Sequence, residues 1–307
     1  MHPSPAEIER AMTAIAPFVR RTPVLEVPGD ELGVDATLVF KLEYLQQSGS
    51  FKGRGAAHFL ATQPIADAGI VAASGGNHGA AVAWAAQRFG HDAHIFVPTT
   101  AAPAKRQRLE SYGATVHLVG DVYSDAYAAS QAFLAEHRAT SIHAYDDPVV
   151  MAGAGTCAME LDTQAGDLDA VLLACGGGGL SGGAAAWFGD RVEIVACETE
   201  GTATYAGARR HGAPVDIDVS GAAADALGAT RLGAHPWQAL SSVDATSAVV
   251  SDDAMLSARD LLWDRYRIVV EPAAATPLAA LVGGQWHPPS PGARVAVVLC
   301  GANTTLG

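Results

Sequence analysis

Short runs of β-branched and aliphatic residues alternate with longer Ala-rich segments along this chain. Such alternation is typical of βα units and predicts an α/β fold with mainly parallel sheets. The apolar runs show little alternation with polar residues, as expected of strands that helices cover on both faces. The pattern predicts strands over residues 38–42, 69–73, 93–97, 115–119, 141–144, 170–174, 192–197, 247–250, 268–270 and 293–299.

Apolar residues at helical spacing fill the segments between these strands. The expected helices cover residues 4–18, 54–62, 79–89, 102–112, 123–138, 149–163, 180–188, 202–211, 252–266 and 274–282. So many strands do not fit one small sheet, and we expect two open α/β domains with a cleft between them. Ligands of such sheets bind at the carboxyl ends of strands, so the Gly-rich turns that follow strands are the candidate sites.

Composition narrows the class of protein. The chain has 19 Lys and Arg against 32 Asp and Glu, a formal charge of −13. This charge repels phosphate backbones and anionic lipids, so we expect no nucleic-acid or membrane partner. Two long uncharged segments, 170–189 and 272–293, are interrupted by Gly or Pro and predict no membrane span.

The cysteines and the amino terminus indicate the compartment. The four cysteines show neither CxxC spacing nor a zinc-like pairing with His, which favours a reducing cytoplasm. The first residues lack the cationic and apolar regions of a signal peptide. We therefore expect a cytoplasmic protein.

A lysine among small residues marks the first candidate loop. Lys52 follows Phe51 in a Ser- and Gly-rich segment, just ahead of the helix expected from residue 54. A lysine amine attacks carbonyl carbon when burial or nearby cations lower its pKa. Of the other two lysines, Lys41 lies in an apolar strand and Lys105 on an Arg-rich helical face. Lys52 is therefore the candidate nucleophile, with a solvated loop lysine as the alternative.

A turn of small and polar residues after strand 69–73 forms the second candidate loop. Its residues are Ser74, Gly75, Gly76, Asn77 and His78. Backbone N–H groups at the start of the following helix, together with the Ser74 and Asn77 side chains, predict a pocket for a carboxylate or oxyanion. The alternative is a tight βα turn that requires Gly for steric reasons and holds a structural histidine.

Four consecutive glycines follow strand 170–174 and open the next helix. They are Gly176, Gly177, Gly178 and Gly179, called the glycine loop below. Their unshielded N–H groups can bind a phosphate, and the helix dipole adds a favourable field. A dinucleotide site is the alternative, because Glu198 lies near the distance of a ribose-binding acid, although the spacing differs from GxGxxG.

Together, a phosphate-binding loop, an available lysine and an anion pocket describe a site for pyridoxal phosphate and an amino acid carboxylate. The segments around Lys52, Asn77, the glycine loop and Cys300 also resemble the fold-type II pyridoxal-phosphate enzymes, specifically the serine/threonine dehydratase and serine racemase family. The resemblance covers nearly the whole chain. It implies a tryptophan synthase β-like fold of two open, mainly parallel-sheet domains with the cofactor in the cleft between them.

The resemblance also implies a domain division and an assembly. A large cofactor-binding domain would comprise residues 1–66 and 147–307, and a small substrate-side domain residues 67–146. A homodimer is expected. No regulatory domain is expected after Gly307, and feedback inhibition is therefore not expected.

The resemblance assigns roles to single residues. Lys52 would form an imine with the cofactor, and Phe51 would pack on its ring. Asn77 would bond the phenolic oxygen, the glycine loop would bind the phosphate, and residues 74–78 would bind the substrate carboxylate. Cys300 would face the pyridine nitrogen as a neutral thiol, which weakens the electron sink and favours prompt loss of a β-leaving group.

Three positions depart from the family pattern, and one of them, Ala226 in Ala224-Asp225-Ala226, replaces a glycine and would reshape the pocket. Gly75 stands where racemases of this family place a serine, so no proton donor is expected on the second face of the cofactor and dehydration is favoured. Thr204 stands where an Asp would bind a divalent cation together with Glu198. We therefore predict no metal site, and Glu198 is the residue on which that question depends.

The sequence is thus interpreted as a pyridoxal-phosphate-dependent ammonia-lyase. It would convert L-threonine or L-serine to a 2-oxo acid and ammonia by β-elimination. A 3-hydroxyaspartate dehydratase and a serine racemase are alternatives within the same fold. A nucleotide-binding oxidoreductase and a ligand-binding pseudoenzyme are alternatives from other classes.

Overall fold

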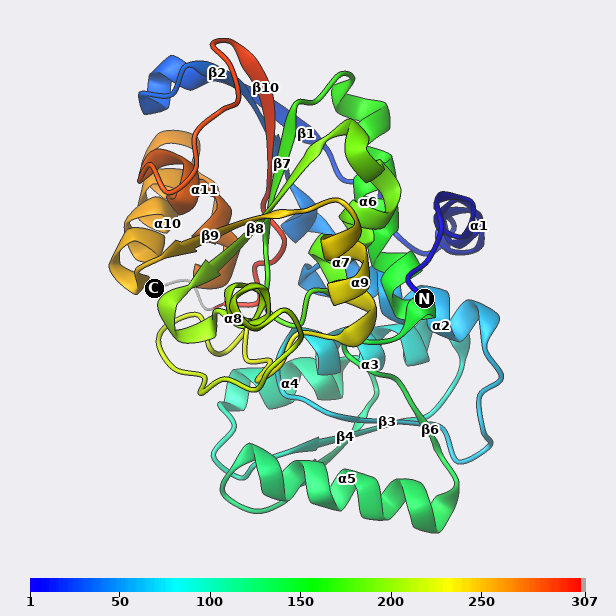
Figure 1. Cartoon of the computed structure of the whole chain (residues 1–307). Coiled ribbons are helices and arrows are strands. Elements are labelled where there is room, and N and C mark those ends of the chain that lie inside the picture. Colours follow the sequence, from blue (N-terminus) through cyan, green and yellow to red (C-terminus); the bar gives the residue numbers. More distant parts are fainter. Residues whose placement is uncertain (305–307) are drawn as a thin grey trace.

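The computed structural model describes residues 1–304 and contains two sheets (Figure 1). The larger sheet has six strands in the order β1-β2-β10-β7-β8-β9, and β1 alone is antiparallel to its neighbour. Its strands are β1 (Val24–Pro28), β2 (Ala36–Lys41), β7 (Ala170–Ala174), β8 (Glu193–Thr199), β9 (Thr246–Val250) and β10 (Ala293–Val298). The predicted α/β class with mainly parallel sheets is confirmed.

The smaller sheet is parallel throughout and has the order β5-β4-β3-β6. Its strands are β3 (Ile70–Ala73), β4 (Ala93–Val97), β5 (Thr115–Leu118) and β6 (Thr140–Ser141). Helix α5 (Tyr123–His137) covers one face and α3 (Asn77–Phe89) covers the other (Figure 1). The two central strands, β3 and β4, are therefore largely buried, as the apolar runs predicted, whereas the edge strands β5 and β6 remain partly exposed.

Helices also cover both faces of the larger sheet. Helices α10 (Asp252–Tyr266) and α11 (Thr276–Val282) lie on one face, and α6 (Pro148–Ala165) and α7 (Gly179–Phe188) lie on the other (Figure 1). The central strands β7 and β10 are buried along nearly their whole length. The remaining helices are α1 (Pro5–Ile15), α2 (Lys52–Thr62), α4 (Pro103–Ser111), α8 (Thr204–His211) and α9 (Ala234–Ser242).

Several elements differ from the sequence prediction. Strand β1 was not predicted, because it is an edge strand with mixed burial and carries no continuous apolar run. Helix α9 was also missed. The predicted strand 268–270 is wrong: Arg267 ends α10 in a left-handed conformation with φ 55°, and the buried residues that follow join no sheet. Strand β6 ends at Ser141 and does not reach residue 144.

Three helices that precede or follow the smaller sheet in the chain contribute side chains to its hydrophobic core. Ile15 of α1, Leu60 of α2 and Val150 of α6 pack with Ile70 and Ile95 of the sheet. These three residues lie outside the segment 67–146. The domain division at those positions stays a prediction, and α1, α2 and α6 link the two sheets.

A buried ion network lies where β2, α2 and α6 meet. The Arg54 guanidinium donates to Glu43 at 2.6 Å (Nε to Oε1) and lies 3.2 Å from Glu160, and Lys41 Nζ lies 2.6 Å from Glu160 Oε1. Lys41, Glu43 and Arg54 are fully buried. Burial disfavours the charge of Glu43, but Arg54 and Lys41 outweigh it and hold the pKa of Glu43 below its ordinary value.

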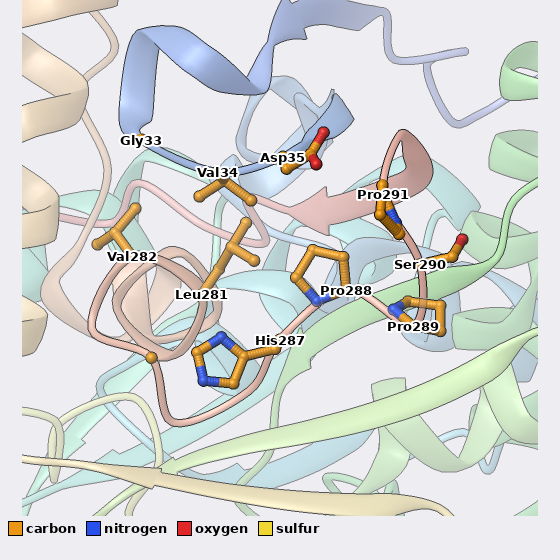
Figure 2. A pocket seen from close by; sticks show the side chains of 11 residues that line it. Gly33, Val34, Asp35, Leu281, Val282, His287, Pro288, Pro289, Ser290 and Pro291 are labelled. Atoms are coloured by element: carbon orange, nitrogen blue, oxygen red, sulfur yellow. The ribbon is translucent and has the colours of Figure 1, made fainter.

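A cavity of about 420 Å³ lies near the amino ends of β2 and β10, whereas Lys41 of the ion network lies at the carboxyl end of β2 (Figure 2). Val34, Leu281, His287 and a Pro-rich loop line it, and none of the predicted site residues do. Within residues 1–304, no helix is long and apolar enough to cross a bilayer.

Replacing Arg54 should destabilise the fold strongly. The variant Arg54→Met leaves Glu43 and Glu160 with one cation between them, and removing one member of a buried ion pair costs about 3–5 kcal/mol. Urea unfolding measures the loss. As a control, Arg231→Met breaks an exposed pair with Asp216 and should change stability by less than about 1 kcal/mol. Equal losses in the two variants would contradict this account.

Candidate active site

Four loops at the carboxyl ends of strands meet in one pocket. It is lined by Phe51, Lys52, Asn77, Ala174, the glycine loop, Leu180, Ala226, Leu227, Glu271, Ala273 and Cys300. Chain segments far apart in sequence thus come together, as expected for open α/β sheets. The predicted cofactor-binding residues line this pocket, whereas Ser74, Gly75, Gly76 and His78 belong to the adjoining loop and do not line it.

Lys52 begins α2 and extends toward the pocket. Its Nζ donates to the Ala144 carbonyl at 2.6 Å and lies 5.0 Å from the centroid of the Phe51 ring. Burial lowers the pKa of Lys52 to about 8, although the nearby Cys300 and Glu271 favour its charged form. About one tenth of this amine is therefore unprotonated at pH 7, far more than for a lysine with the ordinary pKa of 10.5.

The other two lysines are bound to carboxylates. Lys41 pairs with Glu160 in the buried network, and Lys105 of α4 pairs with Asp225. Within residues 1–304, Lys52 is the lysine without a carboxylate partner. The amine of Lys52 is thus held only by a neutral carbonyl group.

The loop after β3 has little space inside it. At Gly79, an added Cβ would lie 1.8 Å from the Ser74 carbonyl oxygen, so only Gly fits. Gly76 N–H donates to Ser74 Oγ at 3.3 Å, and Asn77 opens α3. The loop is thus a tight βα turn, which is compatible with the predicted carboxylate pocket at the start of α3.

His78 is neutral and anchored. Its Nε2 lies 3.0 Å from the Ile142 carbonyl, and burial, together with the charge of Lys52, lowers the pKa of His78 to about 3. The carbonyls of Ile142 and Ala144 thus accept hydrogen bonds from the side chains of His78 and Lys52. Both carbonyls lie just beyond β6, which ends at Ser141.

The glycine loop presents free donors. Within the described part of the chain, the N–H groups of residues 176–179 have no hydrogen-bond acceptor. Gly178 has φ +87°, and Cβ atoms at Gly177 and Gly178 would lie 2.3 Å from the Tyr145 ring and 2.7 Å from Leu232 and Pro236. Glycine is therefore required by close packing, and the unpaired amides at the start of α7 fit a phosphate group.

Cys300 lies at the end of β10, and burial raises the pKa of its thiol. Its carbonyl accepts a hydrogen bond from Phe51 N–H at 3.0 Å, which ties the Lys52 segment to the sheet. The thiol at this pocket wall is therefore neutral, and its place at the cofactor ring nitrogen stays a prediction.

Glu271 is a site residue that sequence reasoning left without a role. Its carboxylate lines the pocket and accepts a hydrogen bond from Asn77 Nδ2 at 2.7 Å. Burial raises the pKa of Glu271 to about 7, and the charge of Asp225 adds to the shift. The Glu271-Pro272 pair was the available sequence signal, but it followed a segment wrongly predicted as a strand.

Glu198 lies outside the pocket and caps a helix. Its carboxylate accepts from the N–H groups of Tyr205 and Ala206 at 2.6 and 2.9 Å, and from the Thr204 hydroxyl at 3.2 Å. Burial raises the pKa of Glu198 to about 7. Across residues 1–304, no group of three or more His, Cys, Asp or Glu residues is arranged to hold a metal ion.

Comparison with known proteins identifies related sequences. A family model described as "Pyridoxal-phosphate dependent enzyme" matches residues 15–301. The chain is 32% identical over 282 residues to an L-threonine ammonia-lyase of Geobacter sulfurreducens, covering 90% of this chain and 70% of the relative. It is 30% identical over 316 residues to a serine racemase of Oryza sativa subsp. indica, covering 98% of this chain and 91% of the relative.

A solved structure agrees with this relationship. The maize serine racemase superposes with a TM-score of 0.92 at 28% identity and covers 100% of this chain and 95% of that chain. The dehydratase and racemase resemblance read from the motifs is therefore confirmed at the level of the family and fold. The comparisons favour this family over the nucleotide-binding oxidoreductase.

The lowered pKa of Lys52 predicts a pH dependence of stability. Between about pH 8 and the ordinary pKa of 10.5, the unfolded chain binds a proton at Lys52 that the folded chain does not. Lys52 therefore makes stability rise with pH across this interval, by at most about 1.4 kcal/mol per pH unit. Urea unfolding of the cofactor-free protein should show a smaller rise for Lys52→Met than for the wild type.

Lys105→Met provides the matched control, because it makes the same substitution at a partly exposed lysine that does not line the pocket. This variant should keep more of the wild-type rise with pH than Lys52→Met does. Identical pH profiles for Lys52→Met and the wild type would show that the Lys52 amine is not desolvated.

Proposed function

The chain belongs to the family of pyridoxal-phosphate-dependent enzymes, and from that premise we propose that it is a dehydratase of β-hydroxy-α-amino acids. L-Threonine or L-serine would be converted to a 2-oxo acid and ammonia by β-elimination. The proposal rests on the surroundings of the Lys52 amine. This amine shares a pocket with the unpaired N–H groups of the glycine loop and has no carboxylate partner within residues 1–304.

The residues of the pocket fit the cofactor. The N–H groups of the glycine loop would bind its phosphate, and Lys52 would hold it covalently through Nζ. Phe51 would pack on one side of the ring, Asn77 would donate to the phenolic oxygen, and Cys300 would lie at the ring nitrogen. When bound, the cofactor supplies the electron sink that makes the Cα proton of the amino acid acidic.

The side chains of this protein would supply proton transfer and orientation. Once the substrate amine has displaced Lys52 from the cofactor, the freed Lys52 Nζ would take the Cα proton, and a pKa of about 8 for the free amine suits that role near neutral pH. The loop of residues 74–78 would hold the substrate carboxylate through N–H groups at the start of α3. His78 would keep this loop in place, because its neutral ring is bound to Ile142.

The absence of a side chain at Gly75 favours elimination over racemisation. Inversion at Cα needs a proton donor on the side opposite Lys52, and Gly75 offers no hydroxyl there. A Cβ at this position would meet Val97 Cγ1 at 3.4 Å, an ordinary contact. The backbone therefore leaves room for a serine that the sequence does not supply.

A reducing compartment and a homodimer are also proposed. All four cysteines are buried and free, and no pair of them forms a disulfide. This arrangement suits a reducing cytoplasm. The homodimer rests on the family resemblance of the sequence.

Lys52→Ala should fold but lose turnover by about 1,000-fold or more, because it removes both the covalent attachment and the base. Formation of the 2-oxo acid from L-threonine and L-serine measures the loss. Borohydride reduction and peptide mapping of the wild type should place the cofactor on Lys52, and Lys105→Ala should retain that label. Labelling of Lys41 or Lys105 in the wild type would refute the assignment.

Gly75→Ser tests whether the residue at position 75 decides between elimination and racemisation. The wild type should form 2-oxo acid from L-serine with little D-serine, and Gly75→Ser should raise the D-serine fraction several-fold by adding a hydroxyl donor. Chiral chromatography measures both products. Gly76→Ser is the matched control, since its Cβ would also be tolerated at 3.5 Å from Asp225 O. Abundant D-serine from the wild type would contradict the role of Gly75.

A further inference from the structure

The two asparagines of this chain are hydrogen-bonded to each other beside the pocket. Asn303 Nδ2 donates to Asn77 Oδ1 and also to the Ser48 carbonyl, at 3.1 Å for the latter. Asn77 Nδ2 in turn donates to Glu271 Oε1 at 2.7 Å. The start of α3, the segment after α10 and the segment after β10 are thus joined by side chains.

Counting donors and acceptors fixes the direction of the Asn77 amide. Its oxygen is taken by Asn303, and one of its two N–H groups is taken by Glu271. Rotating the amide by 180° would oppose its oxygen to the Glu271 carboxylate and its NH2 to the NH2 of Asn303. With Glu271 ionised, the network therefore permits one orientation, and in the described chain the second N–H of Asn77 has no acceptor.

Both partners of Asn77 pack closely against glycine backbone. An added Cβ at Gly301 would lie 2.4 Å from Glu271 Oε1, and one at Gly49 would lie 2.4 Å from Asn303 Oδ1. Glu271 N–H also donates to the Gly301 carbonyl at 3.1 Å. Glycine at both positions leaves the space that the Glu271 and Asn303 side chains occupy.

We propose that Glu271 and Asn303 are positioning residues that orient Asn77, so that its remaining N–H is free to donate to the cofactor. Neither residue needs to touch the reacting atoms. The inference rests on the cofactor site of the proposed function, but not on which amino acid the enzyme converts.

A double-mutant cycle tests this orientation. Asn303→Asp replaces a donor by an acceptor and should lower the stability of the cofactor-free protein, because Asn77 then lies between two carboxylates. Adding Glu271→Gln supplies a donor on the other side, and the network becomes satisfied with the Asn77 amide reversed. Thermal unfolding should therefore show partial recovery of stability in the double variant relative to Asn303→Asp.

Cofactor affinity should not recover with stability. The reversed amide presents its oxygen, rather than an N–H, to the pocket. Titration of the cofactor-free proteins with pyridoxal phosphate, followed by absorbance, should give a dissociation constant about 10- to 100-fold weaker for the double variant than for the wild type. Glu271→Gln alone should bind within a few-fold of the wild type, because the Gln oxygen can still accept from Asn77.

Two results would overturn the inference. One is recovery of affinity together with stability in the double variant, which would indicate a purely structural network. The other is wild-type affinity in Asn303→Asp. Failure of the proposed reaction gives a different result, in which the wild type binds cofactor at Lys52 but forms no 2-oxo acid from L-threonine or L-serine.

Discussion

The buried network of Lys41, Glu43, Arg54 and Glu160 is the constraint on which the site depends. Two cations and two anions are removed from water together, and each is compensated only while all four hold their places. The network ties β2, α2 and α6 to one another. Because Arg54 is one helical half-turn beyond Lys52, fixing its guanidinium also fixes the start of α2 and the direction in which Lys52 leaves it.

The pocket beside the start of α2 contains polar groups that lack part of their possible hydrogen bonds. The Lys52 amine is held by one carbonyl group, and the glycine-loop amides have no acceptor within residues 1–304. Unpaired buried donors cost free energy in a protein without a ligand. A phosphate at the start of α7 would accept hydrogen bonds from these amides, and an aldehyde would react with the Lys52 amine with loss of water, so the same features support cofactor binding.

The pocket also separates groups by protonation state. The pKa of Lys52 falls to about 8 because its cation is desolvated, whereas the pKa of Glu271 rises to about 7 because its anion is desolvated. Burial keeps the Cys300 thiol neutral by the same effect. A single physical cause thus gives an amine able to accept a proton and a wall without a fixed negative charge at Cys300.

The sequence by itself determined the α/β class, the apolar strands and the family, because these depend on local patterns and on short motifs around Lys52, Asn77, the glycine loop and Cys300. It did not reveal β1, whose edge position leaves no continuous apolar run. It also predicted a strand at residues 268–270, which pair with no other strand. Only the tertiary structure decided that Glu198 caps α8 and that Glu271 and Asn303 hold the Asn77 amide. Those roles arise from contacts between residues up to 226 positions apart, and no local pattern encodes such contacts.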